Sequence, residues 1–212
     1  MQFFPLYLHK KPKKANINKI LLKELKETYN KQPRAEEIFQ YIYAVSHSTN
    51  YRLKYEAFLK IDFPRIPFTT DYALFIEISK LGKKLVNLHL MKSELLSQPL
   101  VKFQGTGNNM IKKVIYNKET ERVYVNATQY FEGIRKDVWE YHVGGYHVLH
   151  KWLKDRKKRK ISLDEIKHYC KIATALQKTI EIQEEVDMLY PKVEKDVIPF
   201  KEEKLSLEKY AK

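Results

Sequence analysis

The pattern of apolar residues changes abruptly after Ser97, and this change constrains the fold more than any other feature of the sequence. Upstream of it, apolar side chains recur at three- and four-residue steps, which is the period of an amphipathic helix. Between residues 98 and 137 that period is lost, and β-branched and aromatic residues gather in short runs. Helical patterns return downstream. The sequence therefore predicts an α+β fold that is mostly helical, with a small antiparallel hairpin or sheet in the middle of the chain.

The upstream part is expected to form a helical subdomain over residues 17–97, preceded by an irregular N-terminal arm over residues 1–16. Apolar spacing predicts helices near 18–29 and 34–45, then a short helix capped by Thr49 or Asn50. A longer helix capped by Thr69 or Thr70 should follow. Its inward residues should be Phe75, Ile78, Leu81, Leu85 and Leu88.

The stretch DFPRIPF at residues 62–68 interrupts these helices. Each proline fixes its own φ and biases the preceding residue toward extended geometry. The stretch is therefore predicted to be a stiff, extended connector. Phe63, Ile66 and Phe68 should be packed, and Arg65 is the one cation among them.

A β-hairpin is predicted in the middle segment, with strands at Val114–Tyr116 and Arg122–Val125 and the residues NKET between them. The preceding GTGNN at 105–109 has the composition of a flexible polar loop. A strand is expected over 138–143, followed by a turn at Gly144-Gly145.

Two more helices are predicted after that turn. The first should bury Val148, Leu149 and Trp152. The second opens with a capping box from Ser162 to Glu165, and Pro191 is expected to limit it. Residues 98–191 should thus complete one domain, and residues 192–212 form a charged tail.

Composition excludes several classes of protein. With 43% hydrophobic and 13% aromatic residues, the chain is not of disordered composition. No apolar run has the length of a membrane span, and the first residues carry their charges after the apolar part, unlike a signal peptide. A cytoplasmic location is therefore expected. The single cysteine, Cys170, excludes an internal disulfide framework and a cysteine-based zinc site.

Catalytic motifs are missing from the sequence, so we expect no catalytic residue, no metal and no cofactor in this chain. There is no Gly-rich phosphate loop, no strand-borne G-x-G, no Asp/Asn-Pro-Pro-Tyr and no Gly-x-Ser-x-Gly. Asp164 and Glu165, with Lys167 beside them, could form the Mg²⁺ site of a nuclease, but Glu165 is already explained by the capping box. His142, His147 and His150 lack an acidic or thiol ligand beside them, which favours packing and surface roles over metal binding.

The charge balance indicates a polyanionic partner. Forty Lys and Arg against 26 Asp and Glu give a net charge of +14, which is typical of nucleic-acid-binding proteins. A lysine-rich, solvated surface is the alternative. The candidate phosphate contacts are Lys112, Lys113, Arg135, Arg156, Lys158 and Arg159. The candidate base-reading residues are Gln104, Asn108, Asn109 and Arg122.

Three separated blocks carry a resemblance to a known family. They are IFQYIYAVSHSTNYRLKYEAFLKIDFPRIPF, LGKKLVNLHL and VWEYHVGGYHVLHKWLKDRKKRKISLDEIKHYCKIATALQKTI. Together they resemble the C-terminal specificity, or target-recognition, region of the type ISP restriction–modification enzymes and related large N6-adenine DNA methyltransferases. The resemblance extends from about Phe3 to Pro191.

The resemblance implies sequence-specific recognition of double-stranded DNA on behalf of an adenine methyltransferase, with S-adenosylmethionine bound in the catalytic domain of the parent polypeptide. Base reading should then fall in the less patterned segment over about 101–137. Arg65 should be a scaffold residue or a phosphate contact rather than a base reader, and the scaffold role is favoured. The alternative is a protein-interaction module that docks a methyltransferase or motor domain with little direct contact to DNA.

Overall fold

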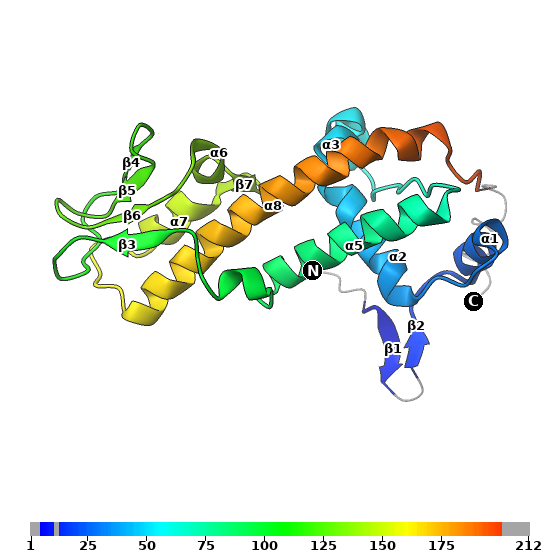
Figure 1. The fold of residues 1–212 in the computed structure, drawn as a ribbon, viewed down its shortest axis with the longest axis horizontal. Coiled ribbons are helices and arrows are strands. Elements are labelled where there is room, and N and C mark those ends of the chain that lie inside the picture. Colours follow the sequence, from blue (N-terminus) through cyan, green and yellow to red (C-terminus); the bar gives the residue numbers. More distant parts are fainter. Residues whose placement is uncertain (1–4, 11–12, 201–212) are drawn as a thin grey trace. The chain divides into compact units, whose positions relative to one another are not determined.

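The computed structural model describes residues 5–10 and 13–200, and it confirms a mostly helical α+β fold (Figure 1). The chain divides into two compact units. We call residues 87–181 the inserted unit, and residues 1–86 with 182–212 the discontinuous unit. The boundaries fall inside helices α5 (Tyr72–His89) and α8 (Leu163–Lys195), away from the divisions expected near residues 97 and 191. None of the helices in the described ranges is both long and apolar enough to span a bilayer.

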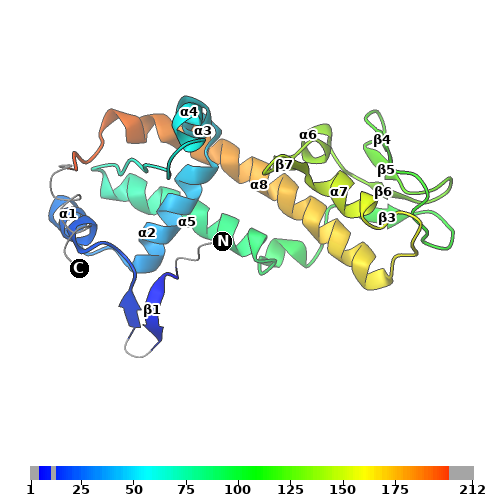
Figure 2. The same cartoon turned by 180° about the vertical axis from the view of Figure 1, so that it is seen from behind.

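The discontinuous unit begins with an antiparallel hairpin of β1 (Tyr7–Lys10) and β2 (Lys13–Ala15), where the sequence predicted an irregular arm. Both views show this hairpin standing out from the helices of its unit (Figures 1 and 2). The Tyr7 hydroxyl donates to the Glu36 carboxylate at 2.6 Å, which ties the hairpin to the next helices. Those helices are α1 (Lys19–Tyr29), α2 (Ala35–His47), α3 (Thr49–Lys54) and α4 (Glu56–Leu59).

The core of the discontinuous unit forms where α2 meets α5 and the C-terminal part of α8. Gly82 allows α5 to approach α2 closely, because a Cβ at this position would lie 1.8 Å from the carbonyl oxygen of Gln40. The Ser48 hydroxyl donates to Asp187 at 2.6 Å, and the Gln183 amide donates to the carbonyl of His47 at 3.0 Å. Helices α2, α5 and α8, which are far apart in the sequence, therefore pack into one core.

The proline stretch is held through its carbonyl groups. The hydroxyls of Tyr51, Tyr41 and Tyr29 donate to the carbonyls of Arg65, Pro67 and Thr69 at 3.1, 2.8 and 2.7 Å. Side-chain donors thus satisfy carbonyl groups that have no main-chain donor, while the Phe68 carbonyl accepts from the Ile198 N–H at 2.8 Å. These bonds hold the main chain of the stretch in place.

Two details of this unit correct the sequence predictions. Phe68 is buried as expected, whereas Phe63 is 74% exposed. Helix α8 runs through Pro191 to Lys195 instead of stopping there. Pro191 removes one helical hydrogen bond, but the neighbouring Tyr190 and Val193 are buried in the core and keep the last turn in place.

Helix caps also differ from those expected. Ser48, not Thr49 or Asn50, accepts from the Tyr51 N–H at the start of α3. Asp71 caps α5, since its carboxylate accepts from the Ala73 N–H at 2.7 Å. Asp71 directly precedes the helix, so its carboxylate reaches the free N–H groups of the first turn, whereas the expected threonines lie further back in the chain.

The inserted unit contains a four-stranded antiparallel sheet in the order β3-β6-β5-β4. The strands are β3 (Lys102–Gln104), β4 (Ile115–Asn117), β5 (Arg122–Tyr124) and β6 (Tyr130–Glu132). The pairing of β4 with β5 confirms the predicted hairpin. One sheet face packs against helix α8, where the rings of Phe131 and Tyr169 lie 4.2 Å apart. Figure 1 shows the sheet beside the N-terminal half of α8.

The elements before α8 in this unit are short. They are the 3₁₀ turn η1 (Glu94–Leu96), α6 (Lys136–Trp139), β7 (His142–Val143), β8 (Tyr146–His147) and α7 (Val148–Lys154). The strand predicted over 138–143 is wrong for its first half. Val138 and Trp139 lie in the single helical turn of α6. The Val138 side chain is buried, and the Trp139 ring stacks on Tyr116 with 5.2 Å between ring centroids. Tertiary packing of these two side chains overrides their β propensity.

Two further predictions for this unit are confirmed. Gly144 and Gly145 have φ of 54° and 80° in the turn between β7 and β8. The Ser162 hydroxyl accepts from the Glu165 N–H at 3.1 Å, and the Glu165 carboxylate accepts from the Ser162 N–H at 3.0 Å, which completes the capping box of α8.

Candidate nucleic-acid interface

One face of the four-stranded sheet is open and polar. Side chains alternate along a strand, so the central residue of each strand points inward while its neighbours point outward. The inward residues are Phe103, Tyr116, Val123 and Phe131. The register aligns the outward residues into two cross-strand rows, Gln104–Tyr130–Tyr124–Ile115 and Lys102–Glu132–Arg122–Asn117. We call these residues the outward sheet face.

The outward sheet face holds two of the predicted base readers, Gln104 and Arg122. The Arg122 guanidinium donates through Nε and Nη2 to one oxygen of Glu132, at 2.9 and 2.5 Å, and it lies over the ring of Tyr130 at 4.5 Å. Hydrogen bonds from the guanidinium to Glu132 and Tyr124 raise the pKa of Arg122, so it stays protonated. Arg122 is therefore fixed in orientation.

The loop over residues 105–109 is pinned by hydrogen bonds, which corrects the expectation of a flexible loop. The buried Gln129 side chain accepts from the Asn109 N–H at 2.9 Å and donates to the Asn109 side chain at 2.7 Å. Asn126 donates to the same Gln129 oxygen at 3.0 Å and to the Met110 carbonyl at 3.1 Å. The backbone at Gly105 has a φ of 92°, a conformation that glycine adopts readily and other residues rarely adopt.

This network gives the two asparagines of the loop different roles. The Oδ1 of Asn109 is bound by Gln129, so Asn109 supports the loop. Asn108 is exposed, and its Oδ1 accepts from the Met110 N–H at 3.1 Å. Of the two, Asn108 is the better placed to meet a ligand.

Main-chain hydrogen bonds bring the basic run Arg156–Lys160 beside the residues that follow the loop. The Ile111 N–H donates to the Arg159 carbonyl at 3.0 Å, and the Lys158 N–H donates to the Ile111 carbonyl at 2.8 Å. The N–H groups of Lys112 and Lys113 both donate to the Val125 carbonyl, at 2.7 and 3.2 Å. Segments 109–113 and 156–161 thus form one ribbon next to the end of β5.

Five lysines of this ribbon have exposed side chains and form no ion pair within the described residues. We call them the lysine ribbon: Lys112, Lys113, Lys157, Lys158 and Lys160. They include three of the predicted phosphate contacts. Unpaired ammonium groups gathered on one edge are suited to an anionic partner.

The two arginines of the basic run have other partners. Arg156 lies 3.7 Å from the centre of the Trp152 ring and donates to Glu165, and its side chain is 26% exposed. Arg159 donates to the same carboxylate and is 56% exposed. The pKa of Glu165 is lowered first by the Ser162 N–H and then by these arginines. Arg156 is therefore largely committed to the fold.

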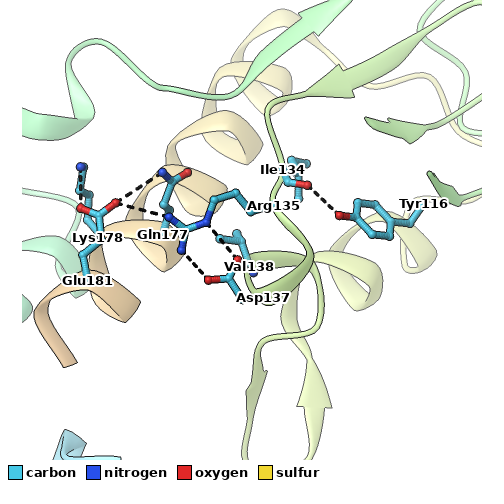
Figure 3. A network of polar contacts seen from close by, with 8 residues as sticks. All are labelled: Tyr116, Ile134, Arg135, Asp137, Val138, Gln177, Lys178 and Glu181. Carbon is cyan, nitrogen blue, oxygen red and sulfur yellow. Dashed lines mark hydrogen bonds and ion pairs between the residues drawn. The ribbon is translucent and has the colours of Figure 1, made fainter. Parts of the chain in front are cut away.

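Arg135 also has acidic partners. It donates to Asp137 and lies 3.9 Å from Glu181, which Lys178 and Gln177 also contact (Figure 3). Arg135 lowers the pKa of Asp137. Glu181 is 16 residues along α8 from Glu165, which corresponds to about 24 Å. The structure therefore separates Arg135 from the basic run.

A hollow of about 830 Å³ lies between β3, the loop over 105–109 and the first turns of α8. Gln104 and Asn109 line it, together with Lys102, which the sequence did not single out, and Lys167, which it raised only for a nuclease site. An isolated lysine on a strand or helix carries no local signal of function. Only the packing of β3 against α8 brings these two lysines to one hollow.

The three histidines form an aromatic cluster with Trp139. The His147 ring lies 5.1 Å from that of His142, 5.5 Å from that of His150 and 4.6 Å from Trp139. The His147 Nδ1 accepts from the His150 N–H at 3.2 Å and so caps α7. Burial, followed by the neighbouring histidines, lowers the pKa of His147. The described part of the chain has no group of three or more His, Cys, Asp or Glu arranged to hold a metal ion.

An α+β domain with an open polar sheet face beside a lysine ribbon has the features of a nucleic-acid-binding domain. The family model of the Type ISP C-terminal specificity domain matches residues 1–185. The chain belongs to this family, which confirms the resemblance seen in the sequence. No curated protein matches it.

Three solved structures share the fold. A nuclease-deletion mutant of the Type ISP restriction–modification enzyme LlaGI, in complex with a DNA substrate mimic, is 22% identical with a TM-score of 0.56, over 73% of this chain and 14% of that one. The ATP-dependent Type ISP enzyme LlaBIII bound to DNA is 22% identical with a TM-score of 0.61, over 82% and 12%. A DrdV–DNA complex is 23% identical with a TM-score of 0.68, over 86% and 21%. The chain thus spans between 12% and 21% of the length of these proteins.

Proposed function

We propose that this chain recognises a specific sequence of double-stranded DNA on behalf of a restriction–modification enzyme. The observation that carries the proposal is the match to a specificity domain over residues 1–185. The solved relatives, which are described as DNA complexes, and the net charge of +14 support it. DNA is then the partner of the inserted unit's basic and polar surface.

The finer activity belongs to the same proposal. The parent enzyme would methylate adenine at N6, using S-adenosylmethionine bound in a methyltransferase domain outside this chain, in the cytoplasm. The specificity domain would place the target so that the adenine can leave the stack. The absence of cofactor and methyltransferase motifs from these 212 residues supports a non-catalytic role for this part.

Within the proposed interface, phosphate contact and base reading fall to different groups. The lysine ribbon provides ammonium groups that neutralise phosphates without regard to sequence. Gln104, Asn108 and Arg122 present the amide and guanidinium groups that read base edges. Arg159 keeps a possible phosphate role because it is 56% exposed, whereas Arg135 and Arg156 are weaker candidates than the sequence indicated.

Duplex binding as a function of salt tests the proposal. We expect the affinity of the chain to fall steeply with salt, with a log–log slope near −0.9 for each neutralised phosphate. Replacing Lys112 and Lys158 by Ala should flatten the slope by about 2 for all sequences. Lys178→Ala is the matched control, because Lys178 is ion-paired with Glu181 and should leave the slope unchanged. A wild-type chain whose binding ignores salt and sequence would contradict the proposal.

One observation favours the alternative of a docking module. On the discontinuous unit, Leu53, Phe58, Ile61 and Phe63 are 68%, 66%, 82% and 74% exposed. Apolar side chains this exposed and this close in sequence are typical of surfaces that another protein covers. If the chain binds no duplex at low salt, this second function replaces the first.

A further inference from the structure

We infer that Arg122 reads a guanine in the major groove, and that Glu132 and Tyr130 hold its guanidinium ready for that base. This inference rests on the proposed function and assigns one position of the recognised sequence. It turns one predicted base reader into a claim about a particular base.

The hydrogen bonds of Arg122 leave the correct edge of its guanidinium free. A guanidinium has five N–H donors in a planar fork. Glu132 takes the side edge, because one of its oxygens accepts from both Nε and Nη2. The ring of Tyr130 covers one face at 4.5 Å. Three N–H donors remain, and two of them, one on each Nη, form the end edge.

That end edge matches guanine better than any other base. Guanine presents two acceptors, O6 and N7, side by side in the major groove, and an arginine can donate to both. Adenine presents N7 next to an amino donor, which would face the arginine donor to donor. A guanidinium that is already oriented also loses less conformational freedom on binding than a free side chain. The acceptor pattern favours guanine at this position, and the fixed orientation strengthens the contact.

The charges around Arg122 argue against a phosphate contact. Glu132 is already paired with Arg122, so this cation is partly neutralised before a ligand binds. A partly neutralised guanidinium attracts a phosphate less than a free one does, but it can still donate to an uncharged base edge. The five lysines of the lysine ribbon, by contrast, form no ion pair within the described residues.

The position of Arg122 suits a groove contact. It begins β5, and Val125, just beyond the end of that strand, accepts the N–H groups of Lys112 and Lys113. Three strand residues span about 10 Å, which is comparable with the major-groove width of about 12 Å. A guanine edge at Arg122 and phosphates at the lysine ribbon are therefore compatible with one duplex.

The test is a selection of randomised duplexes by the whole chain, wild type and variants. We expect the wild-type motif to contain a guanine whose preference falls about 10- to 100-fold in Arg122→Lys, which keeps the charge but loses the fork. The salt slope should not change. Glu132→Gln should weaken the same position to a smaller extent. Arg135→Lys is the control, because that arginine is ion-paired with Asp137 and Glu181.

A change in the DNA provides a second test that does not depend on variant folding. Replacing that guanine by 7-deazaguanine removes the N7 acceptor, so it should weaken the wild-type chain but not Arg122→Lys. The assignment is overturned if Arg122→Lys keeps every base preference, or if it weakens all sequences alike and flattens the salt slope. A wild-type chain with no salt-dependent binding or no preference would overturn the proposed function itself.

Discussion

Replacing Gln129 by Ala should release the pinned loop over residues 105–109 while leaving the rest of the inserted unit folded. The Gln129 side chain is 2% exposed and makes hydrogen bonds to the Asn109 N–H, the Asn109 side chain and the Asn126 side chain. The first two fix Asn109 and, through it, the loop. The substitution removes all three bonds at once.

The magnitude follows from these bonds. Each hydrogen bond contributes about 0.5–1.5 kcal/mol net, and a buried N–H left without a partner costs about 1–3 kcal/mol. Asn109 is only half-buried, so water replaces part of what is lost. We therefore expect the free energy of local opening at Asn109 to fall by about 2–3 kcal/mol. At 1.4 kcal/mol per tenfold, its amide should exchange about 30- to 150-fold faster.

Native-state hydrogen exchange is the suitable assay, because it detects local opening that a global unfolding curve misses. The Asn109 and Met110 amides should accelerate, whereas the amides of β5 should not. Gln104→Ala is the matched control, since it removes the same kind of side chain from β3 without touching this network. The reasoning is refuted if the Asn109 amide exchanges at the wild-type rate in Gln129→Ala, or if Gln104→Ala accelerates it equally.

Three further predictions concern stability. Arg156→Ala should lower the free energy of unfolding by about 1–2 kcal/mol, because its guanidinium covers an indole and bonds a carboxylate. Lys158→Ala should change stability by less than about 0.5 kcal/mol; denaturant titrations that reverse this order would contradict the assignment. The pKa of His147 is lowered on folding, so its contribution is complete above the unfolded pKa of about 6.5 and is lost as pH falls toward the folded pKa. His147→Asn keeps a capping group that does not titrate, and should therefore reduce the loss of stability between pH 7.5 and 5.5; an unchanged loss would exclude this residue as its source. Gly82→Ala should cost at least about 2 kcal/mol, since the added Cβ would lie 1.8 Å from the carbonyl oxygen of Gln40; a neutral result in thermal unfolding would show that the two helices can separate.

The sequence predicted the elements whose signals are local. The β4–β5 hairpin, the Gly144-Gly145 turn and the Ser162–Glu165 capping box each depend on residues a few positions apart, and all three were found. The helix at Val138 and Trp139 was missed because its stability comes from packing on distant side chains such as Tyr116. Local propensity cannot report such contacts.

The candidate site shows the same division. Residue type pointed to Gln104 and Arg122, but only strand register reveals that they share one face. Arg156 and Lys158 look alike in the basic run, yet Arg156 covers Trp152 whereas Lys158 is exposed. Gln129 carried no signal, because its importance lies in contacts with Asn109 and Asn126.

The insertion of one unit into another has a consequence for synthesis on the ribosome. The inserted unit lies within residues 87–181, so it can complete its contacts as soon as that stretch has emerged. The discontinuous unit cannot, because Ser48 and His47 bond to Asp187 and Gln183. At about 5–20 residues per second, Ser48 and His47 wait roughly 7–28 s for these partners. During that interval the apolar faces of α2 and α5 lack their last covering helix, and a chaperone that binds nascent chains would meet them there.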